Sequence, residues 1–124
     1  MNTSFYDAVL AYKGDPNKYR ELQAHIDRDL MPGLLGLLHE NTYQPVLVNC
    51  TSIGFFIASL VANELQWKSG SIDRLSNILI EDKRQDLYIM IYKAIQAWDV
   101  DQIEFELFFP PVLTELIVEW YKEQ

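Results

Sequence analysis

The sequence lacks the residues and motifs that most catalytic and metal sites require. It contains a single cysteine, Cys50, so no disulfide can form within the chain. It has no glycine-rich phosphate loop and no GxSxG, CxxC or HExxH motif. From these absences we predict no catalytic residue, no metal and no cofactor, and we interpret the protein as not being an enzyme.

Positive charge is also scarce. Lys and Arg number 10 against 18 Asp and Glu, which gives a net charge of −8. Binding to nucleic acid rests on Lys and Arg that neutralise phosphates, and an anionic membrane surface attracts the same cations. We therefore expect neither nucleic acid nor a membrane as the partner. A basic protein would be attracted, because opposite fields speed encounter.

Long apolar runs are few. Residues 41–63 carry no charge and are numerous enough to span a bilayer, but Pro45 and several polar residues dilute the first half. The strongly apolar part covers only residues 53–62, so we interpret it as a core helix, with a membrane span as the alternative. The lone cysteine and a start without early basic residues indicate a cytoplasmic protein.

Helix signals recur along the chain. They predict an all-α fold in which residues 1–124 form one compact domain of about seven short helices. Ser4 can cap a first helix. Asp15 followed by Pro16 can open a second helix that runs to about Leu30. The apolar residues expected on the inner face of the second helix are Tyr19, Leu22, Ile26 and Leu30.

Two proline sites predict breaks between helices. Met31-Pro32 should end the second helix, because the residue before proline is driven out of the helical region. Residues 34–38 then make a short apolar helix. Pro110-Pro111 should likewise reset the chain, so that Pro111 opens the last helix.

A helix is expected from Thr51 or Ser52 to about Gln66. Its predicted buried stripe is Ile53, Phe56, Ile57, Leu60 and Val61. Beside that stripe lie three small residues four positions apart, which would let a neighbouring helix approach closely: Gly54, Ala58 and Ala62. The next helix begins at Ser71, with Ile72, Leu75, Leu79 and Ile78 inward.

Residues 86–98 should form the central helix of the fold. One predicted stripe comprises Leu87, Ile91, Ala94, Ile95 and Trp98, and further apolar residues, Tyr88, Ile89, Met90 and Tyr92, cover most of the remaining surface. A helix that is apolar nearly all round is typical of the centre of a domain. Segments 44–49 and 102–108 are ambiguous between short helix and strand, because their apolar residues alternate or run too briefly.

Two groups of residues could take part in chemistry. His25 and Asp29 are four apart on a predicted helix and would form half a metal site, and Cys50 could serve as a nucleophile beside a histidine. No further ligand or base stands at a suitable spacing, so we interpret His25 as a surface residue and Cys50 as buried filler. An enzyme is the third interpretation, and it requires His25, His39 or Cys50 to meet carboxylates in a pocket.

The acidic charge is concentrated near the carboxyl end. Residues 1–94 hold 11 acidic and 9 basic residues, whereas residues 95–124 hold seven acidic residues and one basic residue. Apolar and aromatic side chains lie between these carboxylates, a combination that suits an interface with an aromatic centre and a charged rim. The predicted partner-binding residues are Asp99, Asp101, Glu104, Glu106, Glu115, Glu119, Tyr121 and Glu123. The alternative is that these carboxylates only solubilise two short elements.

A compact acidic domain whose charge gathers between Asp99 and Glu123, without a catalytic motif, resembles the immunity proteins of bacterial contact-dependent toxin systems. The resemblance implies that the protein binds and neutralises a basic toxin domain, often a nuclease, and is monomeric in isolation. The same profile fits phage-encoded inhibitors that mimic nucleic acid. The second interpretation is an adaptor or assembly subunit that acts through homo-oligomer or partner-protein contacts.

Overall fold

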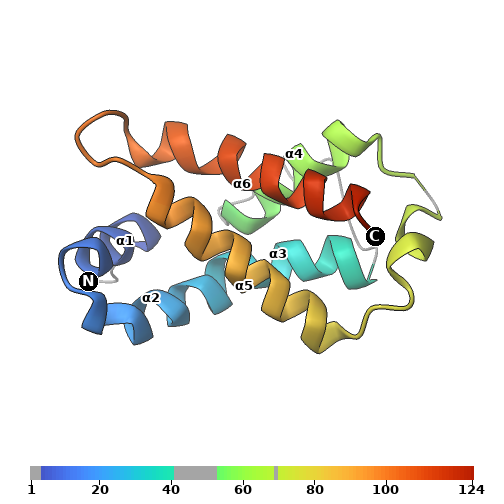
Figure 1. Ribbon diagram of the computed structural model, residues 1–124, viewed down its shortest axis with the longest axis horizontal. Helices are drawn as coiled ribbons and strands as arrows, with labels where there is room; N and C mark the ends of the chain where they lie inside the picture. The colour runs from blue at the N-terminus through green and yellow to red at the C-terminus, as the bar shows by residue number, and fades with distance from the viewer. Residues whose placement is uncertain (1–3, 41–52, 69) are drawn as a thin grey trace.

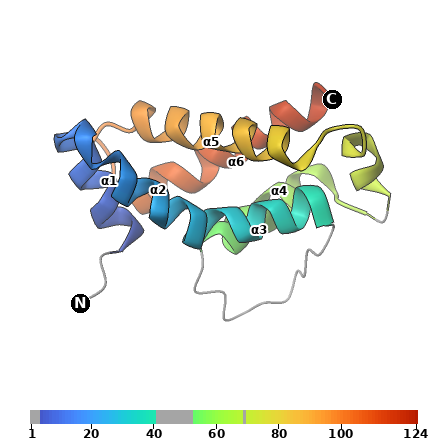
Figure 2. The same cartoon turned by 90° about the horizontal axis from the view of Figure 1, so that it is seen from below.

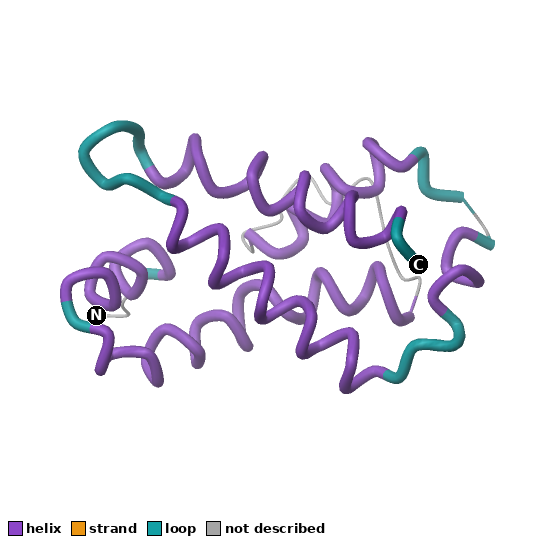
Figure 3. The backbone as a smooth tube through the Cα atoms, in the orientation of Figure 1, coloured by secondary structure: helices purple, strands orange, loops and turns teal. Residues whose placement is uncertain are grey.

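The computed structural model describes residues 4–40, 53–68 and 70–124, and all regular structure within these ranges is helical. The predicted all-α class is confirmed, and Figure 3 shows helices joined by short loops. The helices are α1 (Phe5–Gly14), α2 (Tyr19–His25), α3 (Met31–Leu35), α4 (Ile53–Leu65), α5 (Ile80–Ala97) and α6 (Phe105–Lys122), with 3₁₀ turns at Pro16–Lys18 and Ser71–Leu75 and π-helical turns at Ile26–Leu30 and Gly36–Glu40.

Four helices surround the core. α3 contacts α4, α4 contacts α6, α6 contacts α5, and α5 contacts α3, so the contacts close into a ring. Each helix contributes a fully buried aliphatic residue: Leu34, Ile57, Ile91 and Leu113. α1 packs on α2 at one end, and α5 crosses one face of the molecule (Figures 1 and 2).

The caps predicted at the amino-terminal end are confirmed. The Ser4 hydroxyl accepts a hydrogen bond from the Asp7 amide at 3.1 Å, and α1 begins at the next residue. The Asp15 carboxylate accepts from the Asn17 amide, and Pro16 opens the following 3₁₀ turn. Three of the four inner residues predicted for this second helix are fully buried, but Tyr19 is 46% exposed.

The break predicted at Met31-Pro32 is wrong. Helical turns continue without interruption from Tyr19 to Glu40. Pro32 lies in the first turn of α3, where a missing N–H costs least, and the wider π-helical turn that precedes it absorbs the change in hydrogen bonding. The break predicted at Pro110-Pro111 is also wrong, because both prolines lie inside α6.

The close helix approach predicted from Gly54, Ala58 and Ala62 is confirmed. All three are buried, and Gly54 meets the chain at the start of α3. A Cβ atom on Gly54 would lie 2.4 Å from the Leu30 carbonyl oxygen, and one on Gly33 would lie 2.6 Å from the Gly54 carbonyl carbon. These glycines are therefore required by backbone-to-backbone contact.

The central position predicted for residues 86–98 is only half correct. The stripe from Leu87 to Trp98 is buried, but Ile89, on the opposite face of α5, is 58% exposed. Two other residues expected inside, Phe56 and Leu79, are also exposed. The ambiguous segment 102–108 contains no strand. Residues 102–104 belong to the turn before α6, and residues 105–108 form its first turn.

Some predictions lie outside the described residues. They concern the ambiguous segment 44–49, Cys50 and the capping by Thr51 or Ser52. Within the described ranges, none of the helices is both long and apolar enough to cross a bilayer.

Candidate functional site

The turn between α5 and α6 projects at the end of the molecule where α1 lies (Figure 1). Its shape is fixed by its own hydrogen bonds. The Asp99 carboxylate accepts from the Asp101 amide at 3.0 Å, and the Asp99 carbonyl accepts from the Gln102 amide at 3.1 Å. The Trp98 indole N–H donates to the Ile103 carbonyl at 2.8 Å, which closes the turn.

An aromatic cluster anchors this turn to the core. Phe105, the first residue of α6, stacks on Phe109 with ring centroids 4.8 Å apart and meets Trp98 edge-on at 5.0 Å. Phe5 and Tyr6 of α1 pack on Phe105 from the other side, at 5.6 and 5.9 Å. Since aromatic pairs at these separations are favourable beyond the area they bury, the turn starts and ends on rigid supports.

Lys13 fixes the end of α5 from which the turn departs. Its ammonium donates to the carbonyl oxygens of Ile95 and Trp98 at the end of α5 and lies 5.8 Å from the Trp98 ring centroid. The Ile95 carbonyl also accepts from the Trp98 amide at 3.2 Å. A cation at a helix carboxyl terminus is stabilising. The charge of Lys13 is therefore directed to backbone carbonyls.

Four of the predicted carboxylates meet on this turn. We define the acidic tip as its four exposed acidic residues together with three exposed apolar residues between them: Asp99, Asp101, Glu104 and Glu106, with Val100, Ile103 and Leu107. Within the part of the chain that the structure describes, no Lys or Arg side chain forms an ion pair with these carboxylates. Leu107 is 64% exposed although it lies beside the buried cluster.

The two prolines of α6 add hydrogen-bond acceptors beside the tip. Pro110 and Pro111 have no N–H, so the carbonyls of Glu106 and Leu107 cannot form their helical hydrogen bonds to the residue four positions on. Glu106 and Leu107 are both exposed. These two carbonyls therefore lack the N–H partner that a regular α-helix would supply.

The other three carboxylates lie apart from the tip. Glu115, Glu119 and Glu123 repeat every fourth residue along α6, and we call them the acidic ridge. Helical geometry places Glu115 about 14 Å along the axis from Glu106 and about 180° around it. The seven carboxylates therefore form two separate groups. The single acidic surface that their closeness in sequence predicts is wrong.

Tyr121 is held within the domain. Its hydroxyl donates to the Ser71 carbonyl at 3.0 Å, and its ring packs on Trp67 with centroids 5.4 Å apart. Arg74 covers another part of the ring, at 5.2 Å. The aromatic contribution expected from Tyr121 is therefore committed to internal contacts, and the accessible apolar surface near the carboxylates comes from the tip. The alternation of acidic and apolar residues over 99–107 was the available signal for it.

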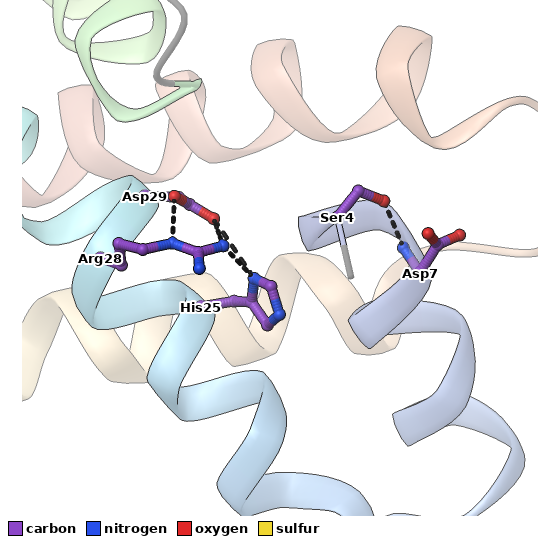
Figure 4. Close-up of polar contacts among 5 residues, drawn as sticks. All are labelled: Ser4, Asp7, His25, Arg28 and Asp29. Atoms are coloured by element: carbon purple, nitrogen blue, oxygen red, sulfur yellow. Dashed lines mark hydrogen bonds and ion pairs between the residues drawn. The ribbon is translucent and has the colours of Figure 1, made fainter. Parts of the chain in front are cut away.

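The residues considered for chemistry have other partners. Arg28 makes hydrogen bonds to both Asp29 carboxylate oxygens, at 2.9 and 3.1 Å, and contacts His25 Nδ1 at 2.7 Å (Figure 4). These bonds from Arg28 hold the pKa of the Asp29 carboxyl below its usual range. His39 contacts the Lys83 ammonium at 3.0 Å. The 14 helical steps from His25 to His39 place the two histidines about 20 Å apart along the helix axis.

No arrangement typical of a metal site is present in the described ranges, which contain no group of three or more His, Cys, Asp or Glu residues able to hold an ion. The comparisons with known proteins found no relative. No family model, curated protein or solved structure matches the chain. Function must therefore be argued from the surface itself.

Proposed function

We propose that the protein is a stoichiometric inhibitor of the immunity type, which binds a basic toxin domain through the acidic tip and acts in the cytoplasm. The observation that carries the proposal is the set of four exposed carboxylates that form no ion pair with any described residue, on a turn fixed by hydrogen bonds and aromatic packing. Such a turn keeps its charges in place before a partner arrives, so little ordering entropy is lost on binding.

The partner's chemistry follows from that of the tip. A nuclease holds its substrate with Lys and Arg side chains that contact phosphates. The four exposed carboxylates of the tip present acceptors that these cations can bind in place of phosphates. Occupying the cationic surface would block access of the substrate. The acidic ridge contributes to the long-range field that speeds encounter.

The exposed apolar residues of the tip slow the dissociation of the complex. Long-range charge mainly raises the association rate, whereas desolvated contacts mainly lower the dissociation rate. Leu107 is the most exposed of the three apolar residues, and Val100 and Ile103 are also exposed. Contact centred on Leu107 and surrounded by carboxylates matches the usual arrangement of an apolar centre with a polar rim.

The test compares two variants that each remove three charges. The tip variant carries Asp101→Asn, Glu104→Gln and Glu106→Gln, and the ridge variant replaces Glu115, Glu119 and Glu123 by Gln. The partner is the product of the adjacent open reading frame or a protein captured from source cells on the immobilised chain. We expect the tip variant to bind it about tenfold more slowly at low salt and to show a weaker salt dependence.

The ridge variant should lose association rate only modestly and keep its dissociation rate. Leu107→Ala should raise the dissociation rate about tenfold, while Leu79→Ala, an equally exposed leucine elsewhere, should not. If the tip and ridge variants bind a genuine partner as fast as the wild type, the tip is not the interface. A partner that is itself acidic would contradict the proposal.

A further inference from the structure

α5 carries a stripe of exposed and half-buried residues that the described helices cover only at its tyrosines. Its residues are exposed or half-buried and recur at spacings of three and four, so they share one face of the helix. We call them the α5 stripe: Gln85, Tyr88, Ile89, Tyr92, Lys93 and Gln96. The opposite face of α5 is fully buried in the core at Leu87, Ile91 and Ala94. α5 thus has apolar residues on both faces, and within one copy of the chain only the face toward the core is fully buried.

The composition of the stripe is that of an interface. Five of its six residues are uncharged, and Lys93 is the exception. It contains two tyrosines and an isoleucine with 58% of its surface exposed. The centres of protein interfaces are depleted in charged residues and enriched in tyrosine.

The surface of the α5 stripe is uneven, with two hollows. A hollow of about 450 Å³ is lined by five of its residues, from Tyr88 to Gln96. A second hollow of about 400 Å³ shares Tyr88 with the first and is lined by Met31, Leu35 and other residues of α3, the preceding turn and α5. Ile89 lines the first hollow and is 58% exposed, so its side chain is available to a partner.

The tyrosines that border these hollows are fixed. The Tyr88 hydroxyl donates to the Asp27 carboxylate, and burial together with this bond raises the pKa of Tyr88 to about 12. Tyr92 meets Tyr12 of α1 edge-on, with centroids 5.9 Å apart. Neutral, positioned rings provide contact area at low cost in conformational entropy.

Charge indicates which partner suits this face. α5 contains three acidic and three basic residues and is neutral, in a chain whose net charge is −8. A strongly basic partner would be drawn to the acidic tip. A second copy of the chain is repelled by most of the surface but not by this face. The first half of α5 holds three acidic residues and two basic ones, and its second half holds Lys93, so the two halves carry net charges of −1 and +1. This small difference favours antiparallel pairing.

We propose that two copies of the chain associate through the α5 stripe as an antiparallel, two-fold symmetric dimer. The stripe positions are symmetric about the point between residues 90 and 91. A two-fold axis there places Gln85 opposite Gln96, Tyr88 opposite Lys93 and Ile89 opposite Tyr92, each pair occurring twice, as in every isologous interface. Lys93 then lies over a tyrosine ring, a favourable position for a cation. This dimer departs from the monomer expected from the sequence.

The affinity should be modest. α5 is about 27 Å long, and one face of a helix about 10 Å wide offers roughly 300 Å² per copy, against about 800 Å² per partner in a standard interface. We therefore expect a dissociation constant on the order of 10–100 µM.

The first experiment measures mass against concentration by sedimentation velocity, on the purified chain without any partner. The wild type should pass from the 14.5 kDa of one chain to twice that mass between about 5 and 500 µM. Ile89→Asp should stay monomeric throughout. The matched control is Leu79→Asp, because Leu79 is 70% exposed but lies off the stripe; this variant should dimerise as the wild type does. Far-UV circular dichroism verifies that both variants are folded.

The second experiment tests the direction of pairing without relying on Ile89. Gln85→Cys and Gln96→Cys are prepared separately in a Cys50→Ser background and mixed under mild oxidation. Antiparallel pairing predicts that the mixture cross-links between the two variants and that neither variant cross-links efficiently with itself. Self-linking of each variant would indicate parallel pairing and overturn the proposal.

A monomer at every concentration, or a dimer that Leu79→Asp disrupts as fully as Ile89→Asp, would also overturn it. A different protein found on this face, with the chain monomeric alone, would have the same effect. These measurements use no toxin. They can therefore disprove the dimer while the proposed inhibitor function holds, and the binding tests can disprove the inhibitor function while the dimer holds.

Discussion

Replacing Gly54 by alanine tests the tightest contact in the fold. The new Cβ would lie 2.4 Å from the Leu30 carbonyl oxygen, 2.6 Å from the Asp29 carbonyl oxygen and 2.7 Å from the Leu30 Cα. Ordinary van der Waals contact begins at 3.4 Å, so α4 must move about 1 Å away from the chain that it crosses. All three atoms belong to the backbone, and no side chain can rotate to relieve the clash.

The expected loss follows from two opposing effects. Overpacking a close contact costs about 1–3 kcal/mol, whereas alanine favours the helix over glycine by up to about 1 kcal/mol. We expect the free energy of unfolding to fall by about 2 kcal/mol, which lowers the melting temperature by about 8 °C in a domain of this size. The urea midpoint should fall while the slope of the transition stays constant.

Gly14→Ala is the matched control. Gly14 also lies in a helix, but a Cβ there has no heavy atom within 4 Å. Its stability should be unchanged or slightly higher. Gly33→Ala should behave like Gly54→Ala, and the double variant should lose less than the sum, because both residues lie at the same crossing. Equal urea midpoints for Gly54→Ala and Gly14→Ala would refute the close approach.

Two further predictions concern charged groups. Lys83 is 2% exposed, and burial lowers the pKa of its amine, so Lys83→Met should raise the free energy of unfolding by about 1 kcal/mol in thermal melts. The control Lys68→Met, at an exposed lysine outside the α5 stripe, should leave it unchanged. The pKa of the Asp29 carboxyl is lowered chiefly by its hydrogen bond with Arg28. The ionised carboxylate therefore stabilises the folded state above the unfolded-state pKa of about 4, and this stabilisation is lost as the pH falls through the lower folded-state pKa. Asp29→Asn should therefore cost stability at pH 7 and much less at pH 3; an equal cost at both, in urea titrations, would contradict this linkage.

Local interactions explain the predictions from sequence that are confirmed. The cap at Ser4 and the Asp15-Pro16 start involve partners within three residues, so the residue types alone define them. The spacing of Gly54, Ala58 and Ala62 likewise marks a face on which two backbones approach. Each of these features is a property of one helix or one turn.

Predictions that needed a neighbour were less accurate. A proline indicates a break unless its neighbours compensate for the lost hydrogen bond. The turn before Pro32 widens, and α6 continues through its two prolines with Phe105, Phe109 and Leu113 buried in the core. Ile89 and Leu79 have the apolar character of core residues, but their exposure depends on whether another helix lies over them. Periodicity identifies apolar faces without showing which face is covered.

The candidate site shows the same division. The sequence by itself determined the helical class, the excess of acidic residues after residue 94 and the absence of catalytic motifs, because these depend on composition and local spacing. Only the tertiary structure decided that the seven carboxylates divide between the tip and the ridge, that Tyr121 is held by Ser71, and that one face of α5 stays open. The physical reason is that the direction in which a side chain points, and whether it meets a partner, is set by how helices distant in sequence pack against one another.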